Sequence, residues 1–331
     1  MTPSLRGLFV PLITPFTEDD DLASGALEKL AHGVIDAGAA GVVALGTTGE
    51  PATLTAAERH AVLDIAARVC RERGAVLIAG AGSNDTAGSA TELRDLAAWP
   101  EVSAALTVVP YYTRPSEEGV VAHFTRLAAQ GPVPLIVYNI PYRTGRVLTA
   151  RTLLRLARVP GIAGAKHAAG AVDQDTILLL SGLLLSGLLE AGPLEAGPLE
   201  AGPLKSGPTT VPQPAVPART AQPGGFAVLA GDDVFVSPLL ALGAAGGILA
   251  SAHLRTGEFA ELIAAWHAGD AGRARALGHR LAPLSAALFA EPNPAVIKGV
   301  LHAQGLIPSP AVRLPLLPAG EDSVRAALAL C

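Results

Sequence analysis

Short apolar runs alternate with longer amphipathic segments along most of this chain. The apolar runs are continuous and do not alternate with polar residues, which is typical of parallel strands buried on both faces. Eight segments have this character, at residues 7–16, 41–47, 76–80, 104–110, 135–139, 162–166, 226–230 and 246–251. They predict eight strands of one parallel sheet.

The segments between these strands have helical periodicity, at residues 27–35, 56–71, 91–98, 119–129 and 149–156. Thr55-Ala-Ala-Glu58 and Ser116-Glu-Glu precede two of them and signal a helix N-terminus. Eight strands in regular alternation with helices predict an α/β fold, the (β/α)8 TIM barrel. An open doubly wound sheet is the alternative, although no GxGxxG follows the first strand.

Helical patterns continue after the last predicted strand, at residues 258–287, 294–304 and 323–330. They predict a C-terminal helical extension. The expected domain organisation is therefore a barrel formed by residues 1–257 and an extension formed by residues 258–331.

Residues 181–225 depart from this pattern. A five-residue repeat fits neither the helical period nor the strand period, and each unit from Pro193 onward contains a proline, which removes a backbone donor. We expect a flexible, low-complexity insertion between helix 6 and strand 7. In a TIM barrel that connection lies on the face remote from the active site. A small partner-docking element is the alternative.

Composition narrows the possible functions. Half of the residues are hydrophobic, so a sizeable core is available, and the net charge of −5 gives no electrostatic case for nucleic acid. The apolar run 177–189 is interrupted by Ser-Gly pairs and is shorter than the ~20 residues of a membrane span.

Cys70 and Cys331 predict no disulfide framework, and no histidines have a metal-binding spacing. Without a secretory signal at the N-terminus, we expect a cytoplasmic protein.

Lys166 is the only lysine in the apolar strand at residues 161–166. An amine with the usual pKa of about 10.4 is almost entirely protonated at neutral pH. Burial disfavours the ammonium form, and a buried lysine with a lowered pKa is the nucleophile of Schiff-base enzymes. The alternative is a lysine that extends from the strand end into solvent.

Polar and aromatic residues gather at the C-terminal ends of other predicted strands, where TIM barrels place their active sites. The second strand ends in Gly46-Thr47-Thr48-Gly49-Glu50, whose glycines and N–H and hydroxyl donors suit a carboxylate. The chain's four tyrosines lie at or just after strand ends, at Tyr111, Tyr112, Tyr138 and Tyr142. Such tyrosines can also simply cover the barrel core.

Together these motifs resemble the dihydrodipicolinate synthase/N-acetylneuraminate lyase family of pyruvate-dependent class I aldolases. The resemblance covers nearly the whole chain except residues 181–225. Its motifs are VPLITPF at 10–16, GTTGE at 46–50, VPYY at 109–112, RPS at 114–116, YNIPYRTG at 138–145, GAK at 164–166, GDD at 231–233, Asn293-Pro294, Lys298, Gly305-Leu306 and RLP at 313–315.

The resemblance implies a role for each matching residue. Lys166 forms a Schiff base with pyruvate, Tyr138 transfers protons, and Thr47 links Tyr138 to Tyr112 of a neighbouring subunit. Thr48 and nearby backbone N–H groups hold the pyruvate carboxylate, while Gly46 and Gly49 allow close approach. Arg143 binds the carboxylate of the incoming aldehyde. Asp232 and Asp233 are expected to cap the turn after the seventh strand.

The implied reaction condenses pyruvate with L-aspartate 4-semialdehyde, without metal or organic cofactor, in a homodimer or homotetramer. Arg143 favours this short acidic aldehyde, because a guanidinium binds a carboxylate bidentately. A related aldolase acting on a sugar acid is the second hypothesis. A non-catalytic paralogue that binds an oxo acid is the third.

Two departures from the family pattern stand out. His167 follows the lysine where the family usually has an acid, which would change the local charge and the preference for the second substrate. Members inhibited by lysine carry a histidine after GTTGE and an acid near the end of the third strand. Here those neighbourhoods contain Ala56, Arg59, Asn84 and Gly88. We therefore expect weak or absent inhibition by lysine.

Overall fold

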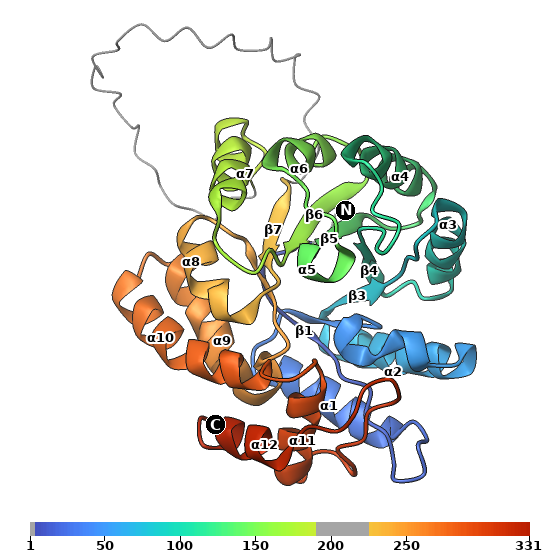
Figure 1. Ribbon diagram of the computed structural model, residues 1–331, viewed down its shortest axis with the longest axis vertical. Coiled ribbons are helices and arrows are strands. Elements are labelled where there is room, and N and C mark those ends of the chain that lie inside the picture. Colours follow the sequence, from blue (N-terminus) through green and yellow to red (C-terminus); the bar gives the residue numbers. More distant parts are fainter. Residues whose placement is uncertain (1–3, 190–224) are drawn as a thin grey trace, which may run out of the picture.

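The computed structural model of the protein describes residues 4–189 and 225–331. Eight parallel strands form a closed barrel, in which each strand pairs with the next and β8 pairs with β1 (Figure 1). The strands are β1 (Gly7–Pro11), β2 (Gly41–Ala44), β3 (Val76–Gly80), β4 (Val102–Val108), β5 (Leu135–Asn139), β6 (Ile162–His167), β7 (Ala227–Ala230) and β8 (Gly246–Ile248). The predicted TIM barrel is confirmed.

Helices surround this barrel (Figure 1). They are α1 (Ser24–Asp36), α2 (Ala56–Arg73), α3 (Thr86–Asp95), α4 (Glu117–Gln130), α5 (Pro141–Thr144), α6 (Ala150–Leu156), α7 (Gln174–Leu185), α8 (Val236–Ala241), α9 (Ala252–His267), α10 (Ala271–Leu288), α11 (Ala295–Ala303) and α12 (Glu321–Leu328). Short 3-10 helices are η1 (Thr47–Gly49), η2 (Pro51–Thr53), η3 (Leu96–Ala98) and η4 (Asp233–Phe235).

Alternation along the strands divides the apolar residues into two layers. One set fills the barrel interior and includes Phe9, Val43, Ile78, Leu106 and Ile136. Their neighbours in sequence point outward and pack against the helices as a larger cluster. Because successive side chains on a strand point to opposite faces, this alternation also decides which polar side chains enter the barrel.

Two of the predicted helix starts are confirmed. Thr55 and Glu58 form a reciprocal capping box at α2, and the Ser116 hydroxyl accepts a hydrogen bond from Gly119 N at α4. Helix α3 begins earlier than predicted, at Thr86, because Asp85 caps it by accepting a hydrogen bond from Gly88 N. A lone aspartate in a polar stretch is a weaker start signal than a capping box.

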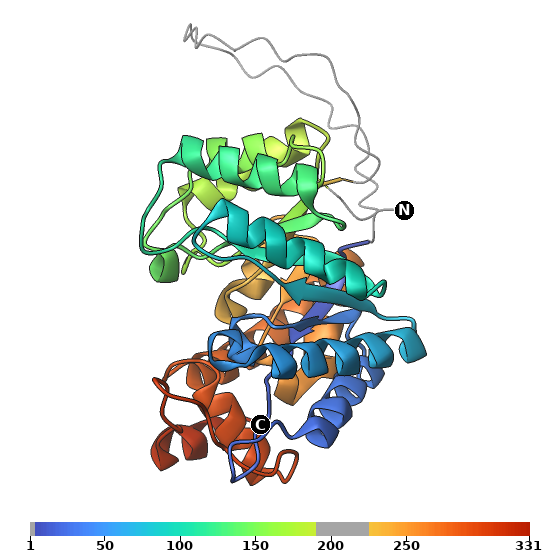
Figure 2. The same ribbon diagram turned by 90° about the vertical axis from the view of Figure 1, so that its right-hand side faces the viewer.

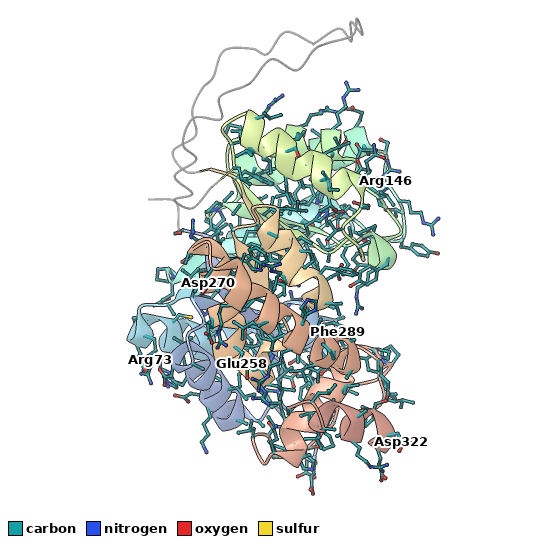
Figure 3. The ribbon with its side chains drawn as sticks, turned by 90° about the vertical axis from the view of Figure 1, so that its left-hand side faces the viewer. Arg73, Arg146, Glu258, Asp270, Phe289 and Asp322 are labelled. Atoms are coloured by element: carbon teal, nitrogen blue, oxygen red, sulfur yellow. The ribbon has the colours of Figure 1, made fainter. Side chains whose placement is uncertain are left out.

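The helix predicted across residues 258–287 is two helices, α9 and α10. The chain turns between them at Gly269, where φ is 77°, and Asp270 caps α10 by accepting from Arg273 N (Figure 3). The expected domain boundary between residues 257 and 258 falls inside α9, so this division of the chain stays a proposal. Figure 2 shows the C-terminal helices and α5 on the same side of the barrel.

Helix α7 extends past residue 181, where we expected the insertion to begin. Leu179, Leu180 and Leu183 are buried against the barrel, so apolar packing continues the helix to Leu185. The main part of the expected insertion, residues 190–224, lies outside the described residues. Leu189 and Phe226 pair in a parallel bridge, which places both ends of that segment together at the N-terminal end of β7. In the described residues, no helix is long and apolar enough to cross a membrane.

Candidate active site

Lys166 and Tyr138 face each other inside the barrel at the C-terminal ends of their strands. The two residues are register partners on β6 and β5, and each is 6% exposed. The Lys166 Nζ lies 4.3 Å from the centroid of the Tyr138 ring. The lysine is therefore buried and does not extend into solvent, which was the alternative left open by the sequence.

Burial is the main cause of the reactivity expected of this pair. It lowers the pKa of Lys166 to about 8, although the nearby carboxylates of Asp233 and Asp232 oppose the shift. A substantial fraction of the amine is therefore neutral near neutral pH. Burial also raises the pKa of the Tyr138 hydroxyl, against the opposing influence of Arg143 and Thr47. Tyr138 therefore remains protonated and can donate a proton.

The turn after β2 presents the two threonines to the same place. Thr48 is 3% exposed, and its Oγ1 accepts a hydrogen bond from Asn293 Nδ2 at 3.0 Å. The Thr14 hydroxyl donates to the Gly49 carbonyl at 2.7 Å and fixes the turn against the chain after β1. A side chain at position 49 would meet the Leu12 carbonyl at 3.1 Å, whereas position 46 has only ordinary contacts. Packing thus explains Gly49, whereas no close contact requires a glycine at position 46.

Arg143 lies on α5 at the mouth of the barrel and is exposed. It lines both a small hollow of about 20 Å³ around Lys166 and an adjoining groove of about 540 Å³. Thr47, Tyr138 and Asn293 also line both spaces. Across the described residues, Arg143 makes no ion pair with a carboxylate of its own chain. The guanidinium is thus free to bind an acidic ligand.

Several residues of this site had no catalytic or binding role assigned from the sequence. Gly231 is needed for space, because a Cβ there would lie 2.9 Å from Lys166 Cγ. Asn293 holds Thr48, and Asp233 lines the hollow beside Lys166. Phe289, which directly follows α10 (labelled in Figure 3), lines the same hollow. The strings GDD and Asn293-Pro294 marked these places, but only the fold brings them next to the lysine.

We had expected Asp232 and Asp233 to cap the turn after the seventh strand, but neither side chain does so. Asp232 accepts hydrogen bonds from Gly170 N at 2.6 Å and from the Tyr142 hydroxyl at 3.1 Å. Asp233 accepts from Ser251 N at 2.6 Å. The two carboxylates therefore connect β7 to the loops after β6, β5 and β8, because the strand ends converge at the barrel mouth.

Tyr112 lies apart from the other expected site residues. It has φ 64°, is 90% exposed and lines neither the hollow nor the groove. A single chain therefore does not bring it to Thr47. Tyr111 takes a place in the groove instead.

His167 points away from the Lys166 side chain, because successive side chains on a strand face opposite sides. Its Nδ1 lies 3.2 Å from Asn139 Nδ2 and its Nε2 lies 2.9 Å from Thr176 Oγ1. Burial lowers its pKa, so the ring is neutral near pH 7. The expected effect of this histidine on the local charge and on the preference for the second substrate stays a prediction. The histidine connects the barrel to α7.

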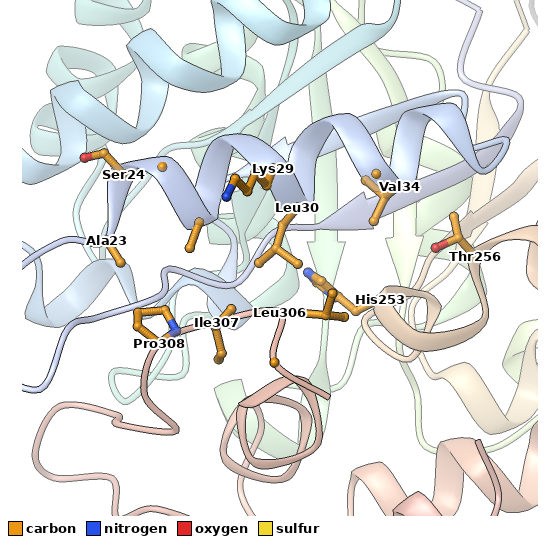
Figure 4. A pocket seen from close by; sticks show the side chains of 14 residues that line it. Ala23, Ser24, Lys29, Leu30, Val34, His253, Thr256, Leu306, Ile307 and Pro308 are labelled. Carbon is orange, nitrogen blue, oxygen red and sulfur yellow. The ribbon is translucent and has the colours of Figure 1, made fainter. Parts of the chain in front are cut away.

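Another hollow is remote from this chemistry. It measures about 660 Å³ and lies between α1 and residues 305–308 (Figure 4). His253 lines it, but both ring nitrogens are within hydrogen-bond distance of backbone groups, and burial lowers its pKa to about 4. In the described part of the chain, no three His, Cys, Asp or Glu side chains gather to hold a metal ion.

A buried lysine beside a buried tyrosine, at the mouth of a TIM barrel, is typical of the class of Schiff-base-forming aldolases and lyases. Comparison with known proteins narrows this class. The model of the dihydrodipicolinate synthetase family matches residues 4–182 and 213–330, and the chain belongs to this family.

Individual relatives agree with the family assignment. The chain is 34% identical to 4-hydroxy-tetrahydrodipicolinate synthase 2 of Clostridium acetobutylicum over 319 residues, covering 96% of both chains. Among solved structures it is similar to the chloride-inhibited dihydrodipicolinate synthase of Acinetobacter baumannii in complex with pyruvate, with a TM-score of 0.82, 32% identity and 98% coverage of both chains. It is also similar to a monomeric dihydrodipicolinate synthase variant, with a TM-score of 0.83, 25% identity, and 98% and 95% coverage.

Proposed function

We propose that the protein is a lyase of the class I aldolase type. It condenses pyruvate with L-aspartate 4-semialdehyde to 4-hydroxy-tetrahydrodipicolinate, a step of lysine and diaminopimelate biosynthesis, in the cytoplasm. The observation that carries the proposal is the buried Lys166 amine, with a lowered pKa, 4.3 Å from the Tyr138 ring.

The reaction begins at the lysine nitrogen. The neutral Lys166 amine attacks the ketone carbon of pyruvate, and the Tyr138 hydroxyl supplies a proton to the carbonyl oxygen. Loss of water leaves a positively charged imine, which gives an enamine when the methyl group of pyruvate loses a proton. The enamine carbon attacks the aldehyde. The amino group of the second substrate then displaces Lys166 and closes the ring.

The surrounding residues orient the two substrates. Thr48, held by Asn293, and the N–H groups of its turn bind the pyruvate carboxylate. Gly46 lets the backbone approach it, whereas Gly49 is required by packing against the Leu12 carbonyl. Arg143 binds the carboxylate of the aldehyde substrate from the mouth of the groove.

The neighbouring subunit completes the proton path in this proposal. Tyr112 is exposed on the chain's own surface, where it can reach into a partner's site and meet Thr47. This requires at least a homodimer, and a homotetramer would be a pair of such dimers.

Borohydride reduction in the presence of pyruvate tests the central step. A stable adduct on Lys166, absent from the Lys166→Ala variant, is the expected result, and a wild-type protein that forms no adduct would contradict the proposal. It would support a non-catalytic oxo-acid-binding paralogue.

A related aldolase acting on a sugar acid is the second candidate. A long neutral polyol would leave the exposed Arg143 guanidinium without a partner, which favours the acidic aldehyde. Turnover of aspartate semialdehyde should exceed that of sugar acids, and the Arg143→Ala variant should lose most of this preference.

A further inference from the structure

Asp233 is a buried carboxylate that the proposed reaction does not use. It is 4% exposed at the end of β7, and its Oδ2 accepts a hydrogen bond from Ser251 N at 2.6 Å. Its Oδ1 has no hydrogen-bond partner in residues 4–189 and 225–331. Lys166 and Asp233 line the same hollow of about 20 Å³. An unpartnered buried oxygen is costly unless a charge or a donor meets it during function.

The other charged and titratable groups around this hollow are accounted for. Burial raises the pKa of the Tyr138 and Tyr142 hydroxyls, so both remain neutral. Asp232 is engaged by Gly170 N and the Tyr142 hydroxyl. Arg143 is exposed at the mouth. The remaining residues that line the hollow carry no charge, namely Thr47, Thr48, Gly231, Ile248, Ala250, Phe289 and Asn293.

The charge on Nζ changes during Schiff-base formation. The neutral amine forms a bond to the ketone carbon, the ketone oxygen leaves as water, and one proton is taken up overall. The product is an iminium cation on a side chain that is buried in the barrel mouth. A cation formed there needs a nearby anion. Burial raises the pKa of Asp233 to about 6, so this carboxyl is ionised at neutral and alkaline pH.

We propose that the Asp233 carboxylate is the counter-ion of the cationic Schiff base formed on Lys166. The inference rests on the proposed function, and it gives Asp233 an electrostatic role that the sequence did not indicate. Gly231 precedes it by two positions and leaves room for the lysine, so the GDD motif supplies both the space and the anion.

The counter-ion has a characteristic pH dependence. Below the pKa of Lys166 the starting amine is already a cation, so the carboxylate stabilises reactant and product alike. Above that pKa the starting amine is neutral, and only the iminium gains from the carboxylate. Removing the charge should therefore weaken imine formation at pH 9 more than at pH 6.5.

Borohydride trapping with increasing pyruvate at these two pH values tests the inference in Asp233→Asn. We expect the half-saturating pyruvate concentration to rise by about tenfold or more at pH 9 and much less at pH 6.5. A nearby opposite charge typically shifts the pKa of a cation by about one unit or more, which corresponds to about a tenfold change in the equilibrium. In Asp233→Asn, the pH at which trapping reaches half of its maximal rate should also be lower than in wild type. The Asp233 carboxylate favours the ammonium form of Lys166, and the variant lacks that charge.

Asp232→Asn is the matched control, because it removes the same charge from the adjacent residue and should have a smaller effect. Asp233→Ser is measured in the same way as Asp233→Asn, and thermal melting shows whether each variant is folded. The test therefore does not depend on the folding of a single variant. Equal half-saturating pyruvate at pH 9 in wild type and both Asp233 variants, with trapping intact, overturns the counter-ion inference alone. No wild-type adduct on Lys166 overturns the proposed function as well.

Discussion

At the scale of single residues, the direction of a side chain decides its chemistry. The sequence singled out Lys166 correctly as buried, because a lone lysine inside an apolar strand is costly unless its amine has a task. Strand alternation then directs His167 outward, but the sequence could not show its partners, Asn139 and Thr176. It also could not place Asp233 beside Lys166, because strands distant in sequence converge only in the closed barrel.

The lowered pKa of Lys166 predicts a pH profile for imine formation. The trapping rate at fixed pyruvate should rise as the ammonium loses its proton and should level off above about pH 8. An ordinary lysine would level off only above about pH 10. Trapping measured from pH 6 to 11 distinguishes the two profiles, and a rate still rising beyond pH 10 would contradict the burial argument.

Gly231 predicts a steric effect on the same lysine. The Gly231→Ala variant puts a methyl group 2.9 Å from Lys166 Cγ and 3.0 Å from Cε, so the amine must move. We expect activity to fall by about a hundredfold, as misplacement of a reacting group by about 1 Å can do. The control is Gly33→Ala, at a glycine of α1 whose added Cβ has no atom within 4 Å and whose φ is not positive. Normal turnover by Gly231→Ala would show that the lysine tolerates displacement.

Inhibition by lysine remains a prediction at this scale. An acid does lie near the end of β3, since Glu92 of α3 accepts a hydrogen bond from Gly82 N at 2.8 Å. However, Arg59 Nη2 lies 3.7 Å from Glu92 Oε2 and brings a positive charge to the groove. An effector's ammonium group would meet this arginine, so inhibition should be weak or absent at millimolar lysine. Half-inhibition at micromolar lysine would show the expectation to be wrong.

At the scale of elements, a buried ion pair joins the loop after β2 to the C-terminal extension. Lys298 of α11 is fully buried, and its Nζ lies 2.5 Å from Glu50 Oε1. Lys298 and Arg313 also lie against the Phe16 ring, at 4.1 and 4.2 Å from its centroid. The strands and several helix starts were predictable from local pattern. This contact was not, because its partners are far apart in sequence.

The ion pair predicts a non-additive loss of stability. Lys298→Met leaves the Glu50 carboxylate buried without its partner and should cost about 3–5 kcal/mol of unfolding free energy. Glu50→Gln should be similarly destabilising. The double variant should lose less than the sum of the two, because no unpaired buried charge remains. Denaturant unfolding of the three variants measures this, and strict additivity would argue against a direct interaction.

At the scale of the whole molecule, the closed barrel was predictable from eight apolar runs in alternation with helices. The assembly was not, because the surface of one chain does not show which partner covers Tyr112. Its 90% exposure fits a residue that acts in a neighbouring site, and this leads to a test with mixed subunits.

Tyr112→Phe and Lys166→Ala should each be nearly inactive alone. If Tyr112 acts across an interface, a hybrid dimer contains one site with both native residues. An equal mixture refolded together should therefore recover about a quarter of wild-type activity. Recovery would fail if Tyr112 acted within its own subunit, and a Tyr112→Phe variant that is fully active alone would show that Tyr112 has no role.

The bridge between Leu189 and Phe226 has a use beyond this enzyme's own chemistry. It holds the residues that flank the segment 190–224 together, on the barrel face opposite the proposed substrate entrance. A folded reporter whose own termini are adjacent could be spliced between them in place of residues 190–224. Such a fusion should retain turnover, because the graft would sit a full strand length from every reacting atom.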